Sequence, residues 1–174
     1  MNKKVYLRAL EPDDYKVSVK WRNDDSVVSM LGGSKFFVSS EVEKQWVQNT
    51  ISQSRDIKLA VCTIEDDIYI GNVYLTDIDQ LNRKAKSHIL IGNKDFWGSG
   101  YGTAAMRLLI DYAFNQRNLK RIEALVLEDN IGSQKMHEKL GYKKEGVLRS
   151  SVYKDGRYKD QILYGLLKHE YEPA

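Results

Sequence analysis

The chain has 174 residues, of which 42% are apolar and 29% charged, and its net charge is +3. This composition excludes an intrinsically disordered chain, and no apolar run approaches the ~20 residues of a membrane span. The single Cys62 cannot form an internal disulfide, and the N-terminus lacks the apolar segment of a secretory signal. We therefore expect one domain over residues 1–174, a cytoplasmic location and no membrane partner.

Acidic and basic residues alternate along the whole chain, so we expect no nucleic-acid partner either. Apolar periodicity then predicts the elements of the N-terminal half. Helices are expected over 14–23 and from Ser39 or Ser40 to about Ile51, with Gly32 and Gly33 between them. Strands are expected over 5–10, 57–64, 68–78 and 85–91.

The C-terminal half predicts two helices and three strands. Residues 102–116 form an amphipathic helix with its apolar stripe on one face. A strand over 121–127 precedes a helix over 131–140, which Asn130 caps and Gly141 ends. Strands over 147–153 and 157–167 form a hairpin, because Asp155-Gly156 suits a type I′ turn. The order indicates an α/β fold with six or seven strands and about four helices.

A glycine-rich loop between a strand and a helix carries the chemistry. Three alternate glycines in residues 97–103 let the backbone N–H groups line one concavity, and the following helix adds its own free N–H groups. Such a concavity favours phosphate oxygens. A plain turn, in which the glycines only relieve strain, is the alternative. A Walker loop would need a lysine after Gly102, and a dinucleotide fold would need G-x-G-x-x-G directly after its first strand.

Three motifs resemble one known family. The loop is similar to the acetyl-CoA pyrophosphate loop of the GCN5-related N-acetyltransferases, whose Gln/Arg-x-x-Gly-x-Gly/Ala pattern falls on Trp97, Gly100 and Gly102. Residues 130–142 resemble the family's Asn-x-x-Ala/Ser-x-x-x-Tyr-x-x-Leu-Gly-Phe helix. Residues 145–149 and 155–160 resemble the branch with ribosomal-protein N-terminal and polyamine acetyltransferases. Together the resemblance covers residues 5–170.

The resemblance implies a mixed, strongly twisted sheet with helices on both faces and a splay between its two central strands. Acetyl-CoA would lie in that wedge as the cosubstrate, and no metal is implied. The residues expected to bind it lie on the fourth strand, the glycine loop and the following helix: Ile89, Ile91, Trp97, Gly98, Ser99, Gly100, Tyr101, Gly102, Thr103, Asn130 and Ser133.

The expected catalytic residues depart from the family pattern. Lys86 stands where the family often has a glutamate base, and His88, two residues on, shares its strand face. His88 is therefore the candidate base, or else a strand histidine hydrogen-bonded beside the cleft. His137 stands where the family has a tyrosine that serves the departing thiolate. It is the candidate for that role, or else it borders the core.

The expected activity is direct transfer of an acetyl group from acetyl-CoA to a primary amine, without a covalent enzyme intermediate. A protein N-terminal amine is the favoured acceptor, and a polyamine or amino sugar comes after it. A homodimer is possible. Two alternatives stay open: an oxidoreductase that holds a nucleotide cofactor on the same loop, and an acetyl-CoA-binding module without catalysis. Lys86 and His137 are the support for the module.

Overall fold

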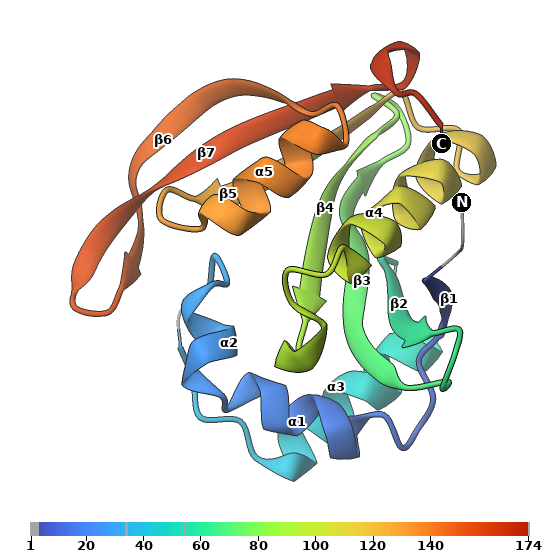
Figure 1. Cartoon of the computed structure of the whole chain (residues 1–174), viewed down its shortest axis with the longest axis vertical. Coiled ribbons are helices and arrows are strands. Elements are labelled where there is room, and N and C mark those ends of the chain that lie inside the picture. Colours follow the sequence, from blue (N-terminus) through green and yellow to red (C-terminus); the bar gives the residue numbers. More distant parts are fainter. Residues whose placement is uncertain (1–3, 34, 54, 174) are drawn as a thin grey trace.

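The computed structural model describes residues 4–33, 35–53 and 55–173 (Figure 1). Its helices are α1 (Tyr15–Arg22), α2 (Asp25–Ser29), α3 (Ser40–Gln53), α4 (Tyr101–Asp111) and α5 (Ile131–Lys139). Its strands are β1 (Val5–Ala9), β2 (Ile57–Thr63), β3 (Tyr69–Asp79), β4 (Lys84–Ile91), β5 (Arg121–Leu127), β6 (Lys143–Lys154) and β7 (Arg157–Leu167). Short turns η1 (Lys94–Phe96) and η3 (Lys168–Glu170) are 3₁₀-helical, and η2 (Tyr112–Gln116) continues α4 as a π-helix.

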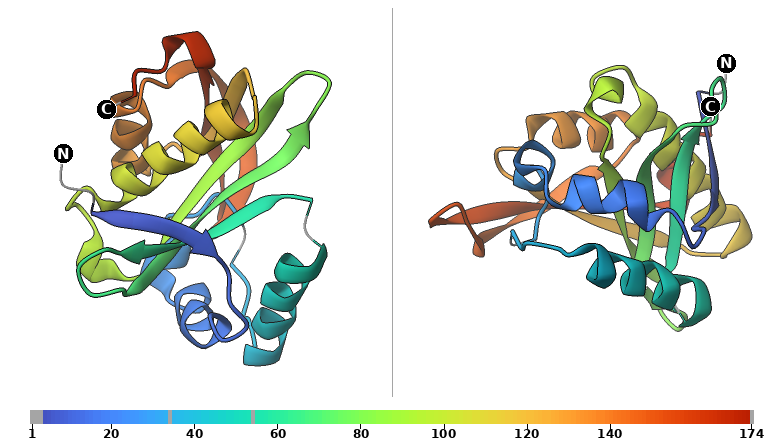
Figure 2. Two further views of the ribbon diagram at one scale, coloured as in Figure 1. Left: turned by 90° about the vertical axis from the view of Figure 1, so that its right-hand side faces the viewer. Right: turned by 90° about the horizontal axis from the view of Figure 1, so that it is seen from below.

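The strands form one seven-stranded mixed sheet in the order β1-β2-β3-β4-β5-β7-β6. Each neighbouring pair is antiparallel except β4 and β5 at the centre, which are parallel. Parallel neighbours need a crossover connection, and the loop after β4 with α4 provides it. The sheet and the helices on both of its faces confirm the predicted fold (Figure 2).

Side chains alternate between two cores along the central strands. On one face the stripe of α4, including Met106, Leu109 and Ile110, packs in the main core with Val73 of β3. On the other face Leu90 of β4 packs with residues of α1 and α2. The period of two therefore places each residue of β4 either under α4 and α5 or under α1 to α3.

The two central strands separate after three residue pairs. β4 pairs with β5 only at Lys84, Ala85 and Lys86, although both strands continue further. The buried hydroxyl of Ser87 donates to the carbonyl of Glu123 at 3.2 Å and lies 2.9 Å from the Tyr142 hydroxyl. This side chain satisfies a β5 carbonyl at the point where the ladder stops, so the splay needs no unpaired buried group there.

Two local differences from the sequence predictions have clear causes. Asp24 accepts a hydrogen bond from the Ser26 N–H and caps α2, a short helix that the periodicity did not predict because it has little more than one turn. β6 begins at Lys143 and is longer than predicted, since register shifts interrupt its alternation. Asp155 and Gly156 have φ of 52° and 79°, which confirms the predicted type I′ turn.

No helix in the described ranges has the length and apolar character needed to cross a bilayer.

Candidate active site

The glycine loop opens a concavity at the start of α4. Gly98 and Gly100 have φ of +70° and +83°, and a Cβ built on either glycine would have no heavy atom within 4 Å. Gly100 is the N-cap of α4 and provides no side-chain cap. Among the described residues, the backbone N–H groups of 98–103 donate no hydrogen bond. They are therefore free to bind an anion, and the positive end of the helix dipole favours it.

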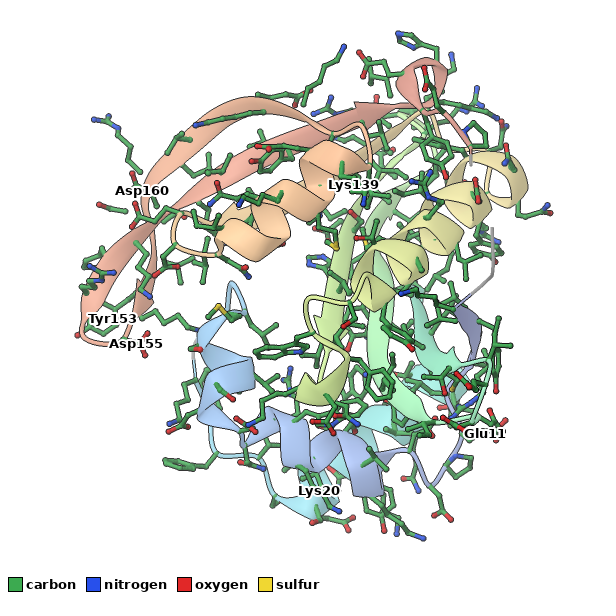
Figure 3. The ribbon with its side chains drawn as sticks, in the orientation of Figure 1. Glu11, Lys20, Lys139, Tyr153, Asp155 and Asp160 are labelled. Carbon is green, nitrogen blue, oxygen red and sulfur yellow. The ribbon has the colours of Figure 1, made fainter. Side chains whose placement is uncertain are left out.

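Two lysines add positive charge beside this loop. Lys135 and Lys139 lie one turn apart on α5, and both line a cavity of about 680 Å³, here called the loop cavity. Its other walls are the glycine loop, the end of β4, the start of α5, and Val27, Met30 and Leu31. Figure 3 labels Lys139 on α5. Lys4 donates to the Ser99 carbonyl at 2.7 Å on the outside of the loop.

The free edge of β4 borders the same cavity. The Gly92 N–H bonds to Ile70 of β3, so strand alternation turns the N–H and C=O groups of Ile89 and Ile91 toward the gap left by β5. The Trp97 indole donates to the Ile91 carbonyl at 2.7 Å and fixes the loop to the strand end. The Ile89 and Ile91 side chains line the loop cavity.

The start of α5 closes the gap from the other side. The Asn130 side chain accepts from the Ser133 N–H at 3.0 Å and caps the helix, as predicted. Its amide nitrogen donates to the Met30 carbonyl at 2.9 Å, which ties α5 to the segment after α2. Asn130 and Ser133 line the loop cavity and also a second cavity beside it, which is described below.

Nine of the eleven expected CoA-binding residues line the loop cavity, and two do not. The two that do not are Tyr101 and Ser99. The Tyr101 ring packs on Phe96 at 4.8 Å between ring centres, and the Ser99 carbonyl accepts a hydrogen bond from Lys4. The remaining nine are Ile89, Ile91, Trp97, Gly98, Gly100, Gly102, Thr103, Asn130 and Ser133. An open cradle of free N–H groups, two lysines and an adjacent strand edge fit a long ligand that carries a diphosphate and amide groups.

A second cavity of about 570 Å³, the wedge cavity, lies between the separated halves of β4 and β5. His88 lines it from the α1–α3 face of the sheet, where Thr76 Oγ1 lies 2.8 Å from His88 Nε2. Burial lowers the pKa of His88, Asp77 opposes that effect, and Lys86 adds to it. Lys86 itself pairs with Asp77 at 2.9 Å, so the ammonium at the family's glutamate position is engaged in an ion pair.

His137 lines the wedge cavity from the opposite face and is only 3% exposed. Its Nδ1 donates to the Ser133 carbonyl at 2.8 Å, while Nε2 is buried without a hydrogen-bond partner among the described residues. Burial lowers its pKa, so the ring is neutral near pH 7 and Nε2 carries a lone pair. The splay thus brings two histidines from opposite faces to one cavity.

Sequence reasoning missed several residues that line these cavities. The spacing of Lys135 and Lys139 on one helix face was a readable signal for their common position. Met30 and Leu31 line both cavities, and only the tertiary structure brings them there. The described residues contain no group of three or more His, Cys, Asp or Glu side chains that could hold a metal ion.

A family model described as an acetyltransferase (GNAT) domain matches residues 4–143. The chain belongs to the GNAT acetyltransferase family. It is 31% identical to an N-acetyltransferase of Bacillus licheniformis, p20, over 97% of this chain and 95% of that protein. It is 27% identical to the spermidine N(1)-acetyltransferase of Escherichia coli, over 96% of this chain and 88% of that protein.

A solved structure agrees with this assignment. The spermidine N-acetyltransferase of Vibrio cholerae, in complex with CoA and spermine, matches with a TM-score of 0.89 and 25% identity, covering 98% of this chain and 99% of that one. This GNAT protein is therefore an enzyme, an acetyl-CoA-dependent N-acetyltransferase. The comparisons do not favour the oxidoreductase or the non-catalytic module.

Proposed function

We propose that this acetyltransferase binds acetyl-CoA along the loop cavity and receives a primary amine through the wedge cavity. The single observation that carries this arrangement is the early separation of β4 from β5, which joins the two cavities at Ile89 and Leu90. Bound acetyl-CoA supplies an activated acetyl thioester. The amine attacks it directly, and the enzyme's part is to hold the two reactants together and to remove a proton.

The residues of the loop cavity hold the cosubstrate in this proposal. The N–H groups of 98–103 bind its diphosphate, with Lys135 and Lys139 beside them. The open edge of β4 at Ile89 and Ile91 pairs with its amide groups, and a backbone N–H there polarises the thioester carbonyl. A donor of this kind lowers a barrier by roughly 3–4 kcal/mol.

His88 is the proposed base. Its ring borders the wedge cavity, and its lowered pKa keeps it unprotonated at neutral pH, as a base requires. His137 is the second candidate, for the sulfur. Because its Nδ1–H is committed to the Ser133 carbonyl, Nε2 accepts a hydrogen bond from the thiol of the product and supplies a proton only after the ring is charged. Burial opposes that charging.

The test is acetyl transfer from acetyl-CoA to a panel of amines, followed as thiol release. The panel contains short peptides with a free N-terminus, spermidine and an amino sugar. We expect turnover with at least one class, and His88→Gln lowers kcat by roughly 100-fold or more without changing acetyl-CoA affinity. The acid limb of the wild-type profile lies below pH ~6.5, because protonation of a base with a lowered pKa removes activity. Binding without turnover of any amine contradicts the proposal.

The proposal also includes the class of acceptor amine, the cellular location and the oligomeric state. Two spermidine acetyltransferases among the relatives support a polyamine, and the motifs at 145–149 and 155–160 support a protein N-terminal amine. A cytoplasmic location is supported by the lone, buried, free Cys62. A homodimer stays a prediction, which sedimentation of the purified enzyme tests.

A further inference from the structure

The wedge cavity has an outer half, away from the glycine loop, where an acceptor would lie. Its walls there come from the end of α1, Phe36, Val38, α3, β2 and β3. The charged side chains in this wall are Arg22 and Lys58, and none of the described residues that line the cavity is an aspartate or glutamate. The residues outside the described ranges are Met1, Asn2, Lys3, Ser34, Ser54 and Ala174, so none of them is acidic either.

The first cation is not neutralised. Within the described ranges Arg22 forms neither a hydrogen bond nor an ion pair, and its side chain is exposed. Its positive charge favours the phenolate form of Tyr74, another lining residue, and so opposes the rise that burial causes in the pKa of that hydroxyl. A free guanidinium in a concave wall is a ready partner for a carboxylate or a phosphate.

The second cation is held in place by an aromatic ring and a carboxylate. Lys58 Nζ lies 5.5 Å from the centre of the Trp46 ring and forms an ion pair with Asp56 at 3.7 Å. Two other acids lie near this half: Asp77 pairs with Lys86, and Glu43, which is buried and acts on Tyr74, accepts a hydrogen bond from Ser18 at 2.6 Å. Neither these acids nor Asp56 lines the cavity, so the charged side chains that do line it, Arg22 and Lys58, are both cations.

The space between these cations is lined by aromatic and apolar side chains. Trp46 and Tyr74 stand edge-to-face with ring centres 6.2 Å apart, and Phe36, 68% exposed, lies at the rim. This lining suits an apolar spacer between the reacting amine and a charged far end.

Building on the proposed function, we infer that the acceptor is a primary amine whose far end carries an anionic group, a carboxylate or a phosphate, and that this enzyme departs from its spermidine-acetylating relatives, so that a polycation is a poor substrate. The far end of a polyamine would place an ammonium among Arg22 and Lys58, where like charges repel. The same position attracts an anion. At a separation of ~4 Å this difference is worth roughly 10-fold or more in kcat/KM.

The test compares amines that share a spacer and differ only at the far end. 6-Aminohexanoate, hexylamine and cadaverine share five methylenes and carry an anion, a methyl group and an ammonium, and 5-aminopentyl phosphate separates phosphate from carboxylate. Longer and shorter spacers repeat the series. We expect kcat/KM to fall from the anion to the methyl group to the ammonium, about 10-fold in total or more. The order of the two anions shows which one the enzyme prefers.

Charge reversal identifies the residues. Arg22→Glu with Lys58→Glu inverts the order of the series, while the KM for acetyl-CoA is unchanged because neither residue lines the loop cavity. Lys20→Glu is the matched control, since Lys20 is also a cation of α1 but points away from both cavities (Figure 3). This control leaves the order as in the wild type.

The outcomes separate this inference from the proposed function. Equal or faster acetylation of cadaverine and spermidine overturns the inference and leaves N-acetylation standing. An order that does not respond to Arg22→Glu with Lys58→Glu also overturns it. If no amine in either panel is acetylated by an enzyme that binds acetyl-CoA, the proposed function falls, and the inference falls with it.

Discussion

At the residue scale, two glycines with positive φ, Gly98 and Gly100, make the proposed diphosphate cradle. Gly156 offers a comparison with Gly100, because their φ angles are +79° and +83° and each has open space where a Cβ would lie. They differ in place, because Gly100 begins α4 at the loop cavity while Gly156 belongs to the hairpin turn. Substituting each glycine in turn therefore distinguishes the effect of backbone strain from the effect on ligand binding.

We predict that Gly100→Ala and Gly156→Ala each lower the free energy of unfolding by about 1 kcal/mol, since both place an L side chain in the left-handed region. Only Gly100→Ala weakens acetyl-CoA binding, by about 10-fold or more, and Gly100→Glu weakens it further through charge repulsion. Calorimetric titration measures both affinities. Equal affinity in wild type and Gly100→Glu would show that the ligand lies elsewhere.

His137 also makes a prediction about stability. Its pKa is lowered in the folded state, so below pH ~6.5 the unfolded chain binds a proton that the folded chain refuses. The free energy of unfolding therefore falls as the pH drops through that window, by at most about 1.4 kcal/mol per pH unit from this group. Urea titrations between about pH 7.5 and about pH 5.5 measure the slope.

In His137→Phe the slope becomes shallower, because the buried group no longer titrates. An unchanged slope in His137→Phe would mean that the acid sensitivity of the fold has another source, such as His88.

At the element scale, the hairpin of β6 and β7 holds the segment after α2, which lines both cavities. Lys154, 3% exposed near the tip of β6, donates to the carbonyls of Val28, Leu31 and Gly33, each at 2.8 Å. Burial lowers the pKa of its ammonium. Figure 3 shows Tyr153 and Asp155 at this tip, beyond α2. A C-terminal strand thus positions an N-terminal wall of the site.

We predict that Lys154→Met lowers the free energy of unfolding by roughly 2–4 kcal/mol, because three carbonyls lose their donor. The KM values for acetyl-CoA and for the amine both rise, since Met30 and Leu31 line both cavities. Lys144→Met, on the exposed part of the same strand, changes neither. Loss of stability with both KM values unchanged would limit Lys154 to a structural role.

At the scale of the whole molecule, the sheet is both the scaffold and the proposed ligand site. The cores on its two faces hold β3 and β4 together along their length, while β5 leaves β4 after three pairs. In the proposed arrangement acetyl-CoA adds interactions at a place where the folded chain leaves a strand edge open. Binding there should stabilise the fold, because the unfolded chain has no such edge.

CoA at 100 times its Kd is expected to add about 2.7 kcal/mol to the free energy of unfolding. For a chain of this length that raises Tm by roughly 5–11 °C, measured by a thermal melt. NAD at the same concentration serves as the control and leaves Tm unchanged. A shift with NAD and none with CoA would contradict the assignment of the loop cavity.

The sequence by itself determined the order of the strands and of the helices other than α2, the I′ turn at Asp155-Gly156, the cap at Asn130 and the glycine loop, because each depends on neighbours within a few residues. The tertiary structure alone decided that Arg22 and Lys58 share a wall, and that Lys154 holds residues 28–33. Those contacts join segments far apart in the chain, and local propensity carries no information about which distant surface a lysine or arginine will meet.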